Sequence, residues 1–256
     1  MRFQIIESSS AGNCAFLDVH GVKLLIDAGI GPKKINSYLS SIGLTPRDID
    51  AVFVTHEHID HYRALRSLKN LPDIKIFANK LTAETIKYLD SDTKQLNWNT
   101  FETGLTFDFM GISVRSFSIP HDTSDAVGYS FSCGGTTLVW ATDLGKVTHS
   151  VYDALHAADV LVLESNYCPV MLDNSPRPFA LKQRIKNSHG HLSNSDAISA
   201  LKNLNFSKLR KVFLAHISRQ CNSVQHIAEL LESSALPLSR IEIVAPCQSS
   251  SMFQDS

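Results

Sequence analysis

With 256 residues, 43% of them hydrophobic, the chain can fill one sizeable core. Its net charge of −1 excludes an overall basic surface that would bind nucleic acid, but local basic patches could still do so. No apolar run has the length of a membrane span, and the N-terminal stretch is too short and too polar for a secretory signal, so neither feature is expected. Five cysteines without a Cys-x-x-Cys pair indicate reduced thiols in a cytoplasmic protein: Cys14, Cys133, Cys168, Cys221 and Cys247.

The first predicted elements are short strands at residues 3–6, 14–19 and 22–26, and Gly21 suits a tight turn between the last two. A loop of small and polar residues separates the first two strands. A helix is predicted at 32–41, because Pro32 suits its first turn and Gly43 suits the position after its end.

An apolar run at 51–54 predicts a buried strand, since it is β-branched and aromatic with no polar break. His56-Glu57-His58-Ile59-Asp60-His61 follows, and then hydrophobic residues recur at helical spacing. Four potential ligands therefore lie on a tight turn, with Asp60 near the positive end of a helix. Imidazole and carboxylate are ligands that suit zinc, manganese and iron. The segment predicts a metal site rather than a polar loop with surface histidines.

The rest of the chain is predicted to contain further strands and helices. Strands are predicted at 74–77, at 127–132, 136–141, 160–163, 212–214 and 241–244, and as a hairpin within 106–119. Helices are predicted at 81–89, 148–157, 180–185, 193–204 and 224–232. Two sets of strands, each followed by helices, indicate an α/β protein with two mixed sheets and helices on both outer faces. We expect a single domain over residues 1–256.

Several polar residues follow predicted strands directly. Convergence of strand ends at one edge of a sheet is how distant positions build a single site. The residues placed in this way are Asp27, His56, His121, Asp143, Glu164 and His216.

The order of these histidines and aspartates resembles the metallo-β-lactamase superfamily, whose fold is an αββα sandwich. Carried over residue by residue, the resemblance implies two divalent transition-metal ions, zinc, manganese or iron. The first would bind His56, His58 and His121, the second would bind Asp60, His61 and His216, and Asp143 would bridge them. An open position at each ion would mark a catalytic site.

Three segments of the C-terminal third resemble the ribonuclease Z-like phosphodiesterases: Leu163-Glu164-Ser165-Asn166-Tyr167, His189-Gly190-His191-Leu192-Ser193 and Leu214-Ala215-His216-Ile217-Ser218. Together with the N-terminal segment Ser8-Ser9-Ser10-Ala11-Gly12-Asn13, the match is closest to the WalJ/YycJ-like exonuclease family. That resemblance covers nearly the whole chain and implies a 5′-to-3′ DNA exonuclease with a metal-bridging hydroxide. Cys168 departs from it, because an acidic residue is expected there.

Two residues are assigned catalytic roles as a hypothesis. Asp60 would orient the hydroxide besides binding metal, and His191 would protonate the leaving oxygen, although a histidine beside a helix cap could also simply pack there. Asp27 and Glu164 are expected to hydrogen-bond the ligands from behind, although a plain turn residue is nearly as good an explanation of Asp27. Candidate phosphate contacts are Ser8, Ser9, Ser10, Asn13, Asn166 and Ser193.

Two basic segments are expected beside the site and could follow a nucleic-acid backbone, or be ordinary solvated faces: Lys182, Arg184 and Lys186, and then Lys208, Arg210 and Lys211. Other functions stay open at this point. A ribonuclease, or a small-molecule hydrolase acting on a thioester, lactone or cyclic phosphodiester, could use the same ligands. A non-catalytic metal-binding protein is disfavoured, because it needs no open bridged site.

Overall fold

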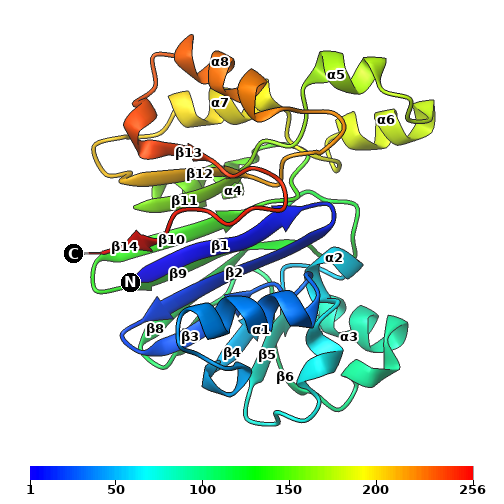
Figure 1. Ribbon diagram of the computed structural model, residues 1–256, viewed down its shortest axis with the longest axis vertical. Coiled ribbons are helices and arrows are strands. Elements are labelled where there is room, and N and C mark those ends of the chain that lie inside the picture. Colours follow the sequence, from blue (N-terminus) through cyan, green and yellow to red (C-terminus); the bar gives the residue numbers. More distant parts are fainter. Residues whose placement is uncertain (256) are drawn as a thin grey trace. The chain divides into compact units, whose positions relative to one another are not determined.

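The computed structural model describes residues 1–255, which group into two units. Unit 1 comprises Met1–Leu105, Thr123–Val127 and the described residues from Cys247 onward, and unit 2 comprises Thr106–Asp122 and Gly128–Pro246. Each unit is built on one seven-stranded sheet (Figure 1). Among the described residues, no helix has both the length and the apolar character needed to cross a bilayer.

The sheet of unit 1 is mixed. Its strand order is β14-β1-β2-β3-β4-β5-β6. The strands β1 to β3 are antiparallel neighbours, and from β3 to β6 every pairing is parallel. In chain order the strands are β1 (Arg2–Ser9), β2 (Gly12–Val19), β3 (Val22–Ile26), β4 (Ala51–Phe53), β5 (Lys75–Asn79), β6 (Asn97–Phe101) and β14 (Phe253–Gln254).

One face of this sheet is covered by helices (Figure 1). They contribute Ile35 and Leu39 of α1, Tyr62 of α2 and Ile86 of α3 to a core that also contains Val52 of β4. Burial of such side chains stabilises the layer by about 1.5–3 kcal/mol each. The helices are α1 (Pro32–Ser41), α2 (Ile59–Tyr62) and α3 (Lys80–Leu89), with 3₁₀ turns at Pro46–Asp48, Leu65–Leu68 and Ser91–Thr93.

The sheet of unit 2 has the order β13-β12-β11-β10-β9-β8-β7. The four strands β10 to β13 are parallel, while β9 is antiparallel to β10 and β7 to β8. The strands are β7 (Thr106–Phe109), β8 (Ile112–Ser118), β9 (Val127–Cys133), β10 (Thr136–Ala141), β11 (Val160–Glu164), β12 (Lys211–Ala215) and β13 (Ile241–Ile243). The strand β11 is buried along its whole length, as expected of a parallel strand in the interior of a sheet.

Helices α4 and α8 pack on this sheet, α4 against β8 and β10 and α8 against β13. Side-chain caps start three helices, because Thr148, Ser193 and Ser223 each accept a hydrogen bond from a backbone N–H of the first turn. The helices are α4 (His149–His156), α5 (Pro169–Asn174), α6 (Phe179–Lys186), α7 (Asn194–Lys202) and α8 (Val224–Glu232), and a 3₁₀ turn spans Leu238–Arg240.

The predicted fold class is confirmed in its elements: two mixed sheets of seven strands with helices. Several details differ. The strands β6 and β14 and the helix α5 were not predicted, and the helix expected after His61 begins already at Ile59 and is split into α2 and the 3₁₀ turn at Leu65–Leu68. The segment of β6, Asn-Trp-Asn-Thr-Phe, is polar because it is a half-exposed edge strand. A single domain over the whole chain stays a prediction.

Candidate metal centre

In unit 1 the histidine-rich segment follows β4, as the sequence predicted: His56 and His58 lie on the turn, while Asp60 and His61 already belong to the short helix α2, for which His58 is the N-cap residue. The loop that follows β3 holds this turn by backbone bonds. The N–H of Ala28 donates to the carbonyl of His61 at 2.8 Å, and the N–H of Ala64 donates to the carbonyl of Ala28 at 2.7 Å. A side chain at Gly29 has no room, since a Cβ there would lie 1.5 Å from the carbonyl oxygen of Asp60. Only glycine permits this close approach of two loops.

Asp27 is the carboxylate behind the turn. It is fully buried and accepts three kinds of hydrogen bond: from the backbone N–H of Thr55 at 2.9 Å, from the Thr55 hydroxyl at 3.1 Å and from Nδ1 of His61 at 2.8 Å. Burial raises the pKa of Asp27, and the bonds to His61 and Thr55 oppose that rise. The predicted hydrogen bonds between Asp27 and the turn are therefore present.

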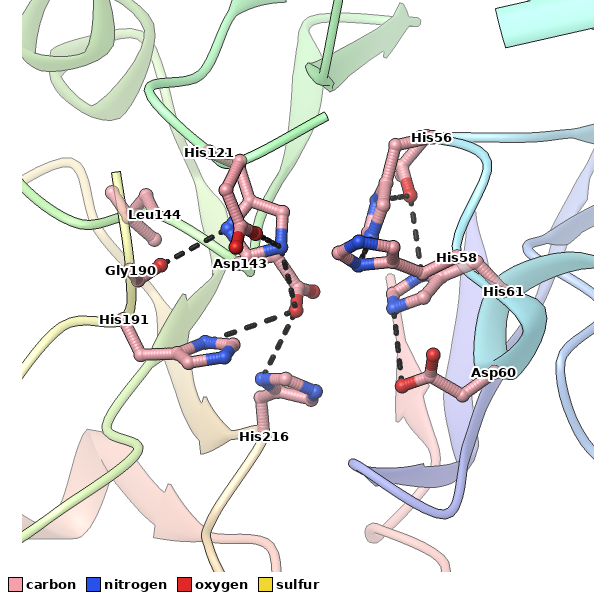
Figure 2. Close-up of polar contacts among 12 residues, drawn as sticks. His56, His58, Asp60, His61, His121, Asp143, Leu144, Gly190, His191 and His216 are labelled. Atoms are coloured by element: carbon pink, nitrogen blue, oxygen red, sulfur yellow. Dashed lines mark hydrogen bonds and ion pairs between the residues drawn. The ribbon is translucent and has the colours of Figure 1, made fainter. Parts of the chain in front are cut away.

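The other ring contacts in the turn are between neighbours. Nδ1 of His56 lies 3.0 Å from the Thr55 hydroxyl, and Nε2 of His56 lies 3.1 Å from Nδ1 of His58. Nε2 of His61 lies 3.7 Å from a carboxylate oxygen of Asp60 (Figure 2). The turn thus gathers three imidazoles and one carboxylate within contact distance of one another.

In unit 2 the predicted site residues follow the strands of one sheet edge. Asp143 lies two residues beyond β10, Glu164 ends β11 and His216 directly follows β12, and these three strands are parallel neighbours. His121 follows β8, and the N–H of Gly145 donates to the carbonyl of Pro120 at 2.9 Å. The carboxyl ends of parallel strands meet at one edge, and this is why residues so far apart in sequence lie together.

Glu164 is the hub of this set. One carboxylate oxygen accepts from Nδ1 of His191 at 2.8 Å and from Nδ1 of His216 at 2.7 Å. The other accepts from the backbone N–H groups of Leu144 at 2.9 Å and Leu192 at 3.0 Å. Burial alone raises the pKa of Glu164, but the charges and hydrogen bonds of His191 and His216 outweigh it and lower the pKa to about 2.

Asp143 and His121 complete the unit 2 set (Figure 2). One carboxylate oxygen of Asp143 lies 3.4 Å from Nδ1 of His216, 3.9 Å from Nδ1 of His191 and 4.0 Å from Nε2 of His121. Nδ1 of His121 lies 3.0 Å from the carbonyl oxygen of Gly190. Single ligand atoms of Asp143, Glu164, His191 and His216 all lie within 4.8 Å of one another.

Three of these residues have a left-handed backbone although none is glycine. The φ angles are 59° at Asp27, 59° at Asp143 and 55° at His216. Such conformations cost on the order of 1–3 kcal/mol each and persist where the surroundings fix them. Asp27 and His216 come directly after β3 and β12, and Asp143 lies two residues beyond β10, so all three strained residues stand at strand ends.

The donor set fits divalent transition metals. Four imidazoles have Nδ1 next to a carboxylate or carbonyl oxygen, which favours the tautomer that leaves the Nε2 lone pair for a cation. A carboxylate or carbonyl behind a histidine is also the usual arrangement around histidines that bind metal. These histidines are His61, His121, His191 and His216.

Comparison with known proteins decides the family. Residues 23–217 match the model of the β-lactamase superfamily domain. The chain is 34% identical to the exodeoxyribonuclease WalJ of Streptococcus pneumoniae, over 90% of this chain and 86% of that protein. It is 29% identical to the exodeoxyribonuclease YycJ of Bacillus anthracis, over 92% and 89%. The chain belongs to the WalJ/YycJ-like family of the metallo-β-lactamase superfamily.

Solved structures share the metallo-β-lactamase fold with this WalJ/YycJ-like chain. The metallo-β-lactamase fold protein YhfI of Bacillus subtilis superposes with a TM-score of 0.74 at 16% identity, and the match covers 99% of both chains. Zinc-bound PqqB of Methylobacterium extorquens gives 0.74 at 15% identity, covering 98% of this chain and all of the other. Likenesses at this level of identity establish the fold alone.

The candidate phosphate contacts of this WalJ/YycJ-like chain are mostly occupied by internal bonds. The Ser8 hydroxyl donates to the Asn13 side chain at 2.9 Å, and the Asn13 amide lies 3.0 Å from Nε2 of His61. Ser9 is buried and Ser10 is exposed. The Asn166 amide donates to the carbonyl of His216 at 2.8 Å, and Ser193 caps α7. Their binding of substrate stays a prediction.

The structure corrects the expected place of one basic segment. Lys208, Arg210 and Lys211 lie at the start of β12, the opposite end of the strand from His216. Lys211 pairs with Glu242 at 2.7 Å. In the other segment, Arg184 pairs with Asp122, the residue after His121. Lys186 pairs with Asp173, and Lys182 donates to the carbonyl of that residue at 2.7 Å.

Sequence reasoning missed several residues that support the site. Thr55 and Gly190 contact the candidate ligands His56 and His121, and the amide of Asn222 donates to the carbonyls of Ser165 and Asn166, each at 2.9 Å. The sequence signal for Gly190 is its place between two histidines. In the structure a Cβ at this position would lie 2.2 Å from the carbonyl oxygen of Ile185, so only glycine fits. Cys168 begins α5 without a side-chain cap, a position where an acidic residue would cap the helix.

Proposed function

We propose that the WalJ/YycJ-like chain is a metal-dependent exodeoxyribonuclease that uses two divalent transition-metal ions, zinc, manganese or iron. Its ligands are the seven residues that the family resemblance implies: His56, His58 and His121 for one ion, Asp60, His61 and His216 for the other, and Asp143 for both. The support is the chemistry of the donors and the anchoring of Nδ1 in His61, His121 and His216.

When bound, two such ions lower the pKa of a water molecule and neutralise charge on the phosphodiester. The protein's own residues then have three tasks. Asp27 and Glu164 fix the orientation of the imidazoles. Asp60 orients the attacking water through its carboxylate. The polar residues around the site hold the substrate, for which Ser8, Ser9, Ser10, Asn13, Asn166 and Ser193 are the candidates.

His191 is proposed as the general acid for the leaving oxygen. Its Nδ1 lies 2.8 Å from Glu164, and its side chain is 20% exposed, whereas that of His216 is 1% exposed. Because Nδ1 faces Glu164, Nε2 is the ring nitrogen left to deliver a proton to a bound substrate.

The observation that carries the proposal is the likeness over 90% of the chain to a protein named as an exodeoxyribonuclease. DNA is therefore the proposed partner, with digestion in the 5′-to-3′ direction. Because the proposed substrate is DNA, we also propose that the protein acts in the cytoplasm.

The test is a substrate panel with metal-loaded protein. It contains 5′-phosphorylated single- and double-stranded DNA, the same sequences in RNA, and bis(p-nitrophenyl) phosphate. The proposal predicts release of mononucleotides from the 5′ end of DNA, faster than from RNA. Turnover of the small phosphodiester alone, with DNA intact, would refute the exonuclease.

The role of His191 is tested by His191→Ala, with His189→Ala as the matched control on the same loop. His189 is exposed, and its Nδ1 lies 3.2 Å from the Ser188 hydroxyl. Turnover should fall about 10²- to 10⁴-fold in His191→Ala with metal content unchanged, and stay near the wild-type value in His189→Ala. Loss of metal would make His191 a ligand instead, and unchanged turnover would remove it from the reaction.

A further inference from the structure

Unit 2 contains a small cavity directly beside the candidate site, which nothing in the proposed reaction uses. Its volume is about 260 Å³, below the roughly 300 Å³ at which pockets for drug-sized ligands begin. Two of its lining residues adjoin site residues in the chain, since Leu192 follows His191 and Gly145 is two residues beyond Asp143. A ligand in this cavity would therefore contact residues that adjoin His191 and Asp143 in the chain.

Three short stretches of chain form the walls. Asp196 and Ser199 are three residues apart on α7 and share one face of that helix, and Leu192 lies just before the Ser193 cap. The loop after β10 contributes Gly145, Lys146 and Val147, and α4 contributes the ring of Tyr152.

The chemistry of the walls favours a flat, neutral ring with polar edges. Val147, Leu192 and the Tyr152 ring supply apolar surface, while the only charges are one cation, Lys146, and one anion, Asp196. A phosphate group would meet the carboxylate of Asp196 and gain little. A nucleobase would place its faces against the apolar walls and its amino and carbonyl groups near Asp196, Ser199 and Lys146.

The Tyr152 ring has two neighbours that restrict its movement before any ligand arrives. It lies 6.1 Å from the ring of His156 between centroids, and its hydroxyl accepts a hydrogen bond from the side chain of Asn203 at 3.5 Å. A fixed aromatic ring at the edge of a pocket is the usual platform for an unpaired base. A preorganised ring loses little conformational entropy on binding.

We propose that this cavity binds one nucleobase of the DNA strand, stacked on Tyr152, and so fixes the position of the neighbouring phosphodiester at the site. This inference rests on the proposed function for its substrate, but its binding step can be measured without any turnover. The enzyme would then require a base at this position but would not distinguish the four bases, because every base offers a flat face.

The first test is equilibrium binding to metal-loaded protein of the four deoxynucleoside 5′-monophosphates and of deoxyribose 5-phosphate, which lacks only the base. The nucleotides should bind more tightly than the sugar phosphate. Tyr152→Ala should weaken nucleotide binding about 5- to 150-fold, the range that stacking on an aromatic residue contributes, and leave deoxyribose 5-phosphate unchanged. Tyr152→Phe keeps the ring and is the matched control, so it should bind like the wild type.

The second test uses 5′-phosphorylated oligonucleotides with a single abasic tetrahydrofuran residue at the first, second or third position. One position should slow digestion by the wild-type protein, and Tyr152→Ala should show no further slowing at that position. Equal binding of nucleotides and sugar phosphate would overturn the inference, as would an equal loss of both in Tyr152→Ala. If binding behaves as expected but no DNA is digested, the exonuclease fails while the base pocket stands.

Discussion

Two buried carboxylates, Asp27 in unit 1 and Glu164 in unit 2, each accept hydrogen bonds from candidate metal-binding histidines of their own unit, and their pKa values shift in opposite directions. Asp27 and Glu164 both have no exposed surface, yet burial raises the pKa of Asp27, while the pKa of Glu164 falls to about 2. The difference lies in their partners. Asp27 faces one imidazole and one threonine, whereas Glu164 faces two imidazoles and two backbone N–H groups. Burial by itself does not decide the pKa of a carboxylate; the charges and hydrogen bonds of the imidazoles beside it count as well, and Glu164 has two imidazoles where Asp27 has one.

The largest effect on stability is expected from Glu164→Ala, which removes the carboxylate that His191 and His216 contact. The change leaves two imidazoles and two backbone N–H groups without their acceptor, so we expect the free energy of unfolding to fall by about 3–5 kcal/mol. Thermal unfolding of metal-free protein measures this. Glu164→Gln is the control that keeps the side-chain volume and one carbonyl acceptor, and its loss should be smaller. Equal melting temperatures for wild type and Glu164→Ala would show that the hydrogen bonds of Glu164 do not stabilise the fold.

The next largest effect is expected on the unit 1 side from Gly29→Ala. Its Cβ would lie 1.5 Å from the carbonyl oxygen of Asp60, so the histidine turn must move, at a cost of about 1–3 kcal/mol. Metal content and turnover should fall with stability. Gly31→Ala is a matched control two residues away, because a Cβ there has no neighbour within 4 Å among the described residues. Wild-type behaviour of both variants would contradict the tight approach of the two loops.

Asp27→Asn should act mainly on metal binding. An amide at position 27 accepts the His61 bond less strongly and can present its N–H₂ instead, which disturbs the tautomer of the ring. The loss expected for a residue behind a metal ligand is about 10- to 100-fold in affinity. A competition titration with a chromogenic chelator measures it. Unchanged affinity would mean that backbone bonds alone orient the turn.

The smallest effect is expected from Thr55→Val, which removes one hydroxyl but keeps the shape of the side chain. The hydroxyl lies 3.1 Å from Asp27 and 3.0 Å from Nδ1 of His56, and its loss should cost about 1 kcal/mol of stability. Denaturant unfolding resolves a difference of this size. Thr55→Ser retains the hydroxyl and should unfold like the wild type; a loss as large as in the valine variant would point to packing instead.

The two parts also differ in how far the sequence revealed them. His56, His58, Asp60 and His61 lie within six positions, so their spacing alone identifies a turn with four ligands. The second set is spread from His121 to His216 and becomes a cluster only through the order of the strands, which no local pattern contains. Its members were found because each follows a predicted strand and because their order resembles a known family.

Other features could not be predicted for specific physical reasons. The bond between His121 and the carbonyl of Gly190 joins residues 69 positions apart, and any residue has a carbonyl. The strand β6 carries polar side chains because it lies at a sheet edge, so its pattern indicates a loop. The cavity beside Tyr152 needs the relative placement of α4 and α7, which follows from packing rather than from either helix alone.

One consequence concerns the order in which the chain can fold during synthesis. The outer neighbour of β1 is β14, whose register joins Arg2 to Gln254, so the chain must be made as far as residue 254 before β1 gains that partner. Unit 2 is nearly continuous between Thr106 and Pro246 and can close its sheet earlier. Until residue 254 leaves the ribosome, β1 offers an open row of backbone N–H and C=O groups, the kind of edge that chaperones shield and that aggregating chains join.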